Sequence, residues 1–105
     1  MDLNLVVLAG RLAAPPDFRV SDSGAFRTRY LVTVRSSEPT RRVDVVPVTI
    51  WDESGDADRE PAVPGSKLWV AGSVQRMFWS DDASKRSRLE IVAHQVEIRD
   101  PHDLD

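Results

Sequence analysis

The sequence contains no cysteine, which excludes a disulfide framework, a thiolate metal site and a cysteine nucleophile. Its only histidines, His94 and His102, belong to no serine–histidine–carboxylate arrangement typical of a hydrolase. A P-loop and a dinucleotide-binding motif are also missing, and the carboxylates of residues 52–58 lack the spacing of a calcium loop. We therefore expect a protein that is not an enzyme and that has no metal site, cofactor or small-molecule substrate.

No apolar run approaches the ~20 residues that are needed to span a bilayer. The first residues lack the basic region that opens a signal peptide. Internal repeats and low-complexity segments are absent as well. The 105 residues suffice for one domain with one core, and we expect a cytoplasmic protein that does not contact a membrane.

Positive charge is scarce overall, since 14 lysines and arginines face 17 aspartates and glutamates, for a net charge of −3. The acidic excess is concentrated in residues 52–60 and in the end of the chain from Glu97. The other segments are mildly basic, and the local field matters more for nucleic-acid contact than the total charge does. Scattered solubilising charge explains the same numbers equally well, so charge alone leaves both interpretations open.

The pattern that the sequence does contain is the alternation of β-strands. From Phe26 to Arg35, apolar and small side chains alternate with three arginines, which is typical of a half-buried strand. Gly10 and Gly72 interrupt two other apolar runs, as expected where a strand bends in a small barrel. The predicted strands are residues 3–14, 26–35, 43–51, 67–79 and 87–99, with a short extended piece at 18–20.

Residues 52–65 and 80–86 are predicted to be surface loops, the first with at most one helical turn and the second a polar hairpin tip. Five strands with little or no helix fit a five-stranded Greek-key barrel, the OB-fold, whereas a β-sandwich would need about seven short strands. We therefore predict an all-β protein in which residues 1–99 form one OB-fold domain and residues 100–105 form a short acidic tail.

Several motifs, taken in order, resemble those of the bacterial single-stranded DNA-binding protein family. Residues 4–12 (NLVVLAGRL) are similar to the family's first strand, and residues 64–74 (PGSKLWVAGSV) to its K-G-x-x-V-x-V-x-G-x-L signature. Residues 24–35 and 44–51 are similar to its second and third strands, and Trp79 falls where the family has a stacking aromatic. The resemblance covers residues 3–99 and implies an OB-fold that binds single-stranded DNA without sequence preference, in replication, recombination or repair.

The chain departs from the family pattern in three respects. A loop rich in proline and aspartate replaces the family's helix between the third and fourth strands, and Val45 and Glu38 stand near positions where relatives carry stacking aromatics. The long tail with an acidic, apolar tip is not seen either. Two alternatives therefore stay open: a dimeric accessory factor that resembles the primosomal replication protein, and an OB-fold module that binds a protein partner.

The resemblance and the strand alternation together indicate which residues contact DNA. A single strand is held by a positive groove and by aromatic faces on which its bases stack. We predict stacking on Trp51, Trp69 and Trp79, and phosphate contacts from Arg27, Arg29, Arg35, Arg76, Lys85, Arg86 and Arg88. The alternatives are that each tryptophan belongs to the core, that Trp69 lies at a subunit contact, and that the cations form an ordinary solvated face. For Phe78, core packing and stacking are equally open.

The apolar first strand, Leu3–Leu12, would leave an unpaired edge that pairing between subunits would bury. We therefore expect a homo-oligomer, with the tetramer as the form that the resemblance implies and the dimer as the alternative. Single-stranded DNA is the expected partner.

Overall fold

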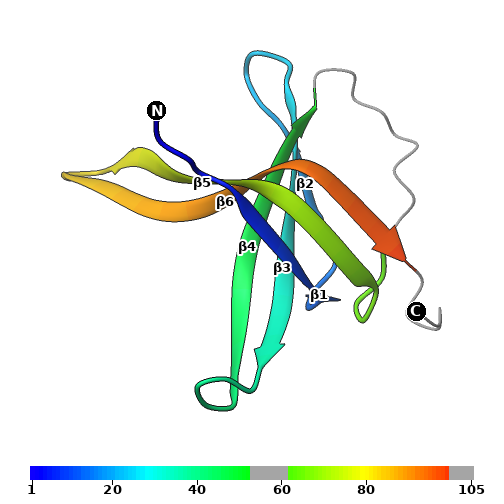
Figure 1. Cartoon of the computed structure of the whole chain (residues 1–105). Coiled ribbons are helices and arrows are strands. Elements are labelled where there is room, and N and C mark those ends of the chain that lie inside the picture. Colours follow the sequence, from blue (N-terminus) through cyan, green and yellow to red (C-terminus); the bar gives the residue numbers. More distant parts are fainter. Residues whose placement is uncertain (53–61, 100–105) are drawn as a thin grey trace.

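The computed structural model describes residues 1–52 and 62–99, and the regular elements of this part of the chain are all strands (Figure 1). They are β1 (Val6–Leu12), β2 (Asp17–Val20), β3 (Phe26–Ser36), β4 (Arg42–Asp52), β5 (Lys67–Asp81) and β6 (Ser84–Arg99). No helix long and apolar enough to cross a membrane occurs in these residues. Most of the predicted loop 52–65 and the whole predicted tail 100–105 lie outside the described residues.

Five long strands close into a barrel. Neighbouring strands follow the order β1–β5–β6–β4–β3, and β3 pairs back onto β1 at Arg11 and Leu12. Only β4 and β6 run parallel to each other, and the other described pairs are antiparallel. The short β2 pairs with the first half of β3 and adds a sixth strand outside the closed ring. The predicted all-β barrel is confirmed, with six strands in place of five because the extended piece at 18–20 finds a partner in β3.

The core is formed by side chains that alternate along the strands. Tyr30 and Val32 of β3 and Val48 of β4 are buried, and the residues between them point outward. Burying one such large apolar side chain contributes roughly 1.5–3 kcal/mol. The buried cluster comprises Leu12, Tyr30, Val32, Val48, Leu68, Val70 and Ala93. The alternation predicted for residues 26–35 is therefore confirmed.

Two glycines allow the strands to approach each other closely enough to close the barrel. A Cβ atom at Gly10 would overlap the carbonyl oxygen of Thr33 on β3, and one at Gly72 would overlap the carbonyl oxygen of Val92 on β6. Beside Gly72 the β5–β6 register skips His94, which makes His94 the extra residue of a β-bulge. The bends predicted from these two glycines thus coincide with the closing contacts of the barrel.

Residues 75–89 of β5 and β6 pair only with each other and extend from the barrel as a two-stranded hairpin arm, on the left in Figure 1. Trp79 lies opposite Arg86, and Ser80 lies opposite Lys85, so only two residues form the turn between the strands. The predicted polar hairpin tip at 80–86 was therefore too long. Both sides of the arm face solvent, so its polar residues form strands that hydrophobic alternation cannot indicate.

Candidate nucleic-acid interface

One outward surface spans β3, β4 and β6 and continues onto the hairpin arm. Arg29 of β3 lies opposite Thr49 of β4, which in turn lies opposite Val92 of β6. Residues that are directly opposite in a sheet share a side, and so do residues two apart on one strand. We call this surface the arginine face; it comprises Arg27, Arg29, Thr49, Trp51, Trp79, Arg86, Arg88 and Glu90.

A buried carboxylate lies at the centre of the arginine face. Glu90 is 6% exposed, and its Oε1 accepts a hydrogen bond of 2.7 Å from the hydroxyl group of Thr49. The carboxylate also lies 3.6 Å from Nη2 of Arg29 and 3.3 Å from Nε of Arg88. Burial by itself raises the pKa of Glu90, but the Thr49 hydrogen bond and the two arginines outweigh burial and hold the pKa below its ordinary value. Glu90 is thus an anion that fixes arginines from two strands.

Trp79 carries the arginine face onto the hairpin arm. Trp79 is 40% exposed, and the guanidinium carbon of Arg88 lies 5.2 Å from the centre of the Trp79 ring. This is a cation–π geometry. Arg86 lies directly opposite Trp79 on the same side of the arm. A half-exposed indole between two arginines combines the stacking surface and the positive charge by which single strands are bound.

Trp51 and Arg27 form the other end of the arginine face. They lie directly opposite each other on β4 and β3, and Trp51 is 43% exposed. Nη2 of Arg27 lies 3.9 Å from the carboxylate of Asp17 on β2. The Nε atoms of Arg27 and Arg29 are buried and have no hydrogen-bond partner among the described residues. The second exposed indole therefore also stands beside an arginine.

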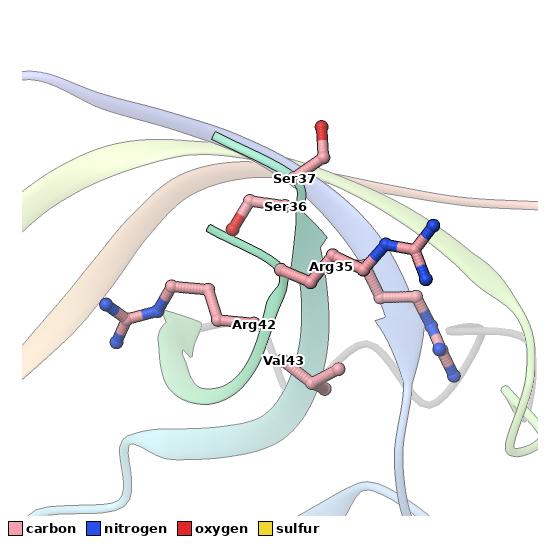
Figure 2. Close-up of a pocket in the computed structure, with 6 residues that line it drawn as sticks. Arg35, Ser36, Ser37, Arg42 and Val43 are labelled. Carbon is pink, nitrogen blue, oxygen red and sulfur yellow. The ribbon is translucent and has the colours of Figure 1, made fainter. Parts of the chain in front are cut away.

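Two of the predicted contact residues, Trp69 and Arg35, lie elsewhere on the barrel. Trp69 is 51% exposed on the first half of β5, between Ala9 of β1 and Glu97 of β6. Arg35 lies near the end of β3, opposite Val43, at a hollow beside the β3–β4 loop. Figure 2 shows Arg35 and Arg42 pointing away from each other at this hollow, and Arg42 forms two hydrogen bonds to Asp44.

Two further predicted residues, Arg76 and Lys85, point to the side of the arm opposite Trp79. Arg76 lies opposite Leu89 and donates a hydrogen bond of 3.1 Å from Nη1 to the hydroxyl oxygen of Ser87. Phe78 also lies on this side and is 74% exposed, which rules out the core interpretation for it. Side chains on a two-stranded ribbon alternate between its two sides, so the arm divides the predicted contact residues into two groups.

Glu90 and Thr49 were not predicted from the sequence as members of the site. Alternation does predict that Arg88, Glu90 and Val92 share a side, because they are two residues apart on one strand. The contact between Glu90 and Thr49, however, depends on the parallel register of β4 and β6, which sets residues 41 positions apart side by side. No local pattern in the sequence carries that register.

The arginine face can offer cations and aromatic rings to a ligand. Within residues 1–52 and 62–99, no group of three or more histidine, aspartate or glutamate side chains is placed to hold a metal ion. The side chains of this surface can make electrostatic, stacking and hydrogen-bonding contacts.

The chain was compared with known protein families. A model of the single-strand binding protein family matches residues 3–99. The chain belongs to this family. The resemblance drawn from the strand motifs is thereby confirmed over the same residues that carried it.

Curated relatives within the single-strand binding family agree with this assignment. Single-stranded DNA-binding protein 1 of Nostoc sp. is 28% identical over 100 residues, which cover 93% of this chain and 84% of the relative. The single-stranded DNA-binding protein of Treponema pallidum is 24% identical over 102 residues, which cover 92% of this chain and 58% of the relative. These names favour the main prediction over an accessory factor or a protein-binding module.

A solved structure shows the same fold. The Plasmodium falciparum SSB complex with ssDNA superposes with a TM-score of 0.77 at 18% sequence identity, covering 95% of this chain and 97% of that one. At this identity the likeness concerns the fold, and it confirms the predicted OB-fold class. The strands described above are therefore arranged as in that chain over nearly its whole length.

Proposed function

We propose that this single-strand binding protein holds DNA across the arginine face, without sequence preference and without chemistry on the strand. Single-stranded DNA binding follows from family membership. Bases stack on Trp79 and Trp51, and phosphates pair with Arg29, Arg86 and Arg88. The protein would act in the cytoplasm, where DNA strands are exposed during replication, recombination or repair.

The observation that carries this proposal is the series of contacts from Thr49 through Glu90 and Arg88 to Trp79. An indole ring has two faces. Arg88 covers one of them at 5.2 Å, and a base can stack on the other. Because Glu90 holds Arg88 before DNA arrives, little side-chain freedom is lost when the base stacks.

Charge balance on the arginine face predicts a moderate dependence of affinity on salt. Four arginines share this surface with Glu90, and Asp17 lies beside Arg27. Each phosphate contact to a single strand contributes about −0.7 to the slope of log K against log salt. With three or four phosphate contacts, the slope should be about −2 to −3.

The test is a titration with oligo-dT, followed by tryptophan fluorescence at several salt concentrations. We expect the fluorescence to be quenched and the affinity to fall as salt rises, because indoles stack on bases and counterions are released from phosphates. If low salt gave no quenching and no binding by an independent method such as electrophoretic mobility, the proposed function would be wrong.

A pair of neighbouring substitutions tests the location of the contact. Trp79→Ala should weaken binding tenfold or more, since a stacked base contributes about 1–3 kcal/mol. Phe78→Ala is the matched control, because Phe78 is an exposed aromatic that faces the opposite side of the same arm. Equal losses in the two variants would show that DNA does not prefer the arginine face.

The oligomeric state forms a second part of the proposal. Val6 to Gly10 of β1 pair with β5 on one side, whereas β3 reaches β1 only at Arg11 and Leu12. Leu3, Leu5 and Val7 are exposed along this segment. Asn4 extends it alongside β5, because its side chain forms hydrogen bonds of 2.7 and 2.8 Å with the backbone of Val74. An open apolar edge of this kind is a template for strand pairing with a second copy.

Sedimentation over a range of concentrations distinguishes a monomer from a dimer or tetramer. Val7→Lys places a charge on the open edge at an exposed position, so the barrel should fold while the subunits separate. A wild-type chain that sediments as a monomer at every concentration would contradict the proposed oligomer and leave DNA binding untouched.

A further inference from the structure

Four cations lie on the neighbouring strands β3, β1, β5 and β6, and the one on β6 is at the end of that strand remote from the hairpin arm (Figure 1). Arg11 of β1 lies directly opposite Lys67 of β5, and Lys67 lies directly opposite Arg99 of β6. Arg11 also lies opposite Thr33 of β3. Two residues further along β3, on the same side, is Arg35. We call Arg11, Arg35, Lys67 and Arg99 the basic row.

An open hollow connects the basic row with an aromatic side chain. This hollow is lined by Arg11, Arg35 and Lys67 together with Trp69. Trp69 is half exposed and does not belong to the arginine face. Trp69 is two residues from Lys67 on β5, so both side chains point outward on the same side of the strand. The hollow therefore offers cations and a stacking surface side by side.

The basic row contains like charges in register, which ordinarily destabilises a sheet. Arg11 donates a hydrogen bond to the carbonyl oxygen of Gly65, a neutral partner. Neither Arg35 nor Arg99 has an ion-pair partner among the described residues. The acid on the same side of β6 is Glu97, which lies opposite Trp69. Within residues 1–52 and 62–99, this row therefore brings together more cations than carboxylates, and the phosphates of a DNA strand are anions that could pair with them.

Building on the proposed function, we infer that the basic row is a second contact region for the same DNA strand. Backbone phosphates lie across the row, and Trp69 receives a base next to them. Arg88 and Arg99 are eleven positions apart on β6, which is roughly 36 Å of strand at about 3.3 Å per residue. At about 3.4 Å per stacked nucleotide, a strand needs roughly ten nucleotides to touch both regions.

The test compares two oligo-dT lengths, about 5 and about 15 nucleotides, on the wild-type chain and on the double variant Arg35→Gln/Arg99→Gln. We expect the variant to bind the shorter oligonucleotide as the wild type does. With the longer one, the slope of log K against log salt should become shallower by about 1.4, since each lost phosphate contact removes about 0.7. Equal slopes for wild type and variant on the longer oligonucleotide would overturn the inference.

The matched control is Arg19→Gln/Arg42→Gln, which removes the same charge from two exposed arginines that are paired with Asp17 and Asp44 on their own strands. If this control flattened the slope as much as the row variant does, the effect would reflect total charge and the inference would be wrong. A wild-type chain that bound neither oligonucleotide would instead refute the proposed function itself, so the two failures are distinguishable.

Discussion

The arginine face and the basic row hold the same kind of side chain in opposite electrostatic settings. On the arginine face, the buried carboxylate of Glu90 lies within 3.6 Å of Arg29 and Arg88. In the basic row, Arg11, Lys67 and Arg99 stand opposite one another across three strands. A cation beside an internal anion stabilises the fold and has a fixed position. A cation opposite another cation raises the local potential and slightly destabilises the sheet.

This difference separates two ways of binding one strand. Fixed side chains such as Arg88 lose little entropy when a base stacks beside them, which favours tight local contact. A concentrated positive potential attracts phosphates wherever they lie, and its effect is strongly screened by salt. We therefore expect the arginine face to determine binding of short strands and the basic row to determine the salt dependence of long ones.

The largest effect should come from removing the internal anion. Glu90→Ala leaves Arg29 largely covered and without its carboxylate, and Thr49 without its hydrogen-bond acceptor. We expect the free energy of unfolding to fall by about 3 kcal/mol, the lower end for breaking a buried ion pair. Urea denaturation measures this loss. Glu97→Ala, which removes an exposed carboxylate of the same strand, should stay within about 0.5 kcal/mol of wild type.

Tryptophan substitutions should distinguish the arginine face from the basic row by their effects on the binding of short and long oligonucleotides. Trp51→Ala removes an indole of the arginine face and should weaken binding of a short oligo-dT about tenfold, since one stacked base contributes about 1–3 kcal/mol. Trp69→Ala should leave the short oligonucleotide unaffected and weaken only a longer one. Titrations monitored by fluorescence anisotropy of labelled DNA avoid the loss of the protein's own signal. The distinction between the two regions would be wrong if the affinities of the two variants changed in the same way with oligonucleotide length.

Acid should weaken the arginine face through Glu90. Because the pKa of Glu90 is lower in the folded chain than its ordinary value of 4.5, the unfolded chain binds more protons in that range. This contribution to stability is present above pH 4.5 and is lost as the pH falls through the lowered pKa. Unfolding by urea at about pH 7 and about pH 3 should show a larger difference between the two pH values for wild type than for Glu90→Gln. An equal difference would assign the acid sensitivity to other carboxylates.

Much of the barrel could be predicted from the sequence, because strand alternation is local. The pattern at residues 26–35 fixed which side of β3 faces the core, and Gly10 and Gly72 indicated the bends at which the barrel closes. The hairpin arm was harder to predict. Polar residues such as Ser84 and Lys85 face solvent on both sides of the ribbon, so their pairing leaves no hydrophobic signature.

The candidate site could be predicted as a set of residue types but not as an arrangement. Arginines and tryptophans on outward positions followed from alternation, and the structure places Trp51, Arg29 and Arg88 on one surface. The basic row was missed because Arg11, Lys67 and Arg99 come from three strands far apart in the chain. Cross-strand register depends on turns and bulges along the whole barrel, and a single sequence does not specify it locally.

The smallest effect should come from the basic row and should have the opposite sign. Arg99→Gln removes one member of a directly opposed cation pair, so the free energy of unfolding should rise by about 0.2–0.5 kcal/mol. The gain should shrink at high salt, because screening already weakens the repulsion in the wild type. Arg88→Gln is the matched control from the same strand and should lower stability, since Arg88 contacts Glu90 and Trp79. Urea unfolding at low and high salt measures both changes. If Arg99→Gln destabilised the chain as Arg88→Gln does, Arg99 would be stabilised within the fold, and the contrast between the two basic regions would not hold.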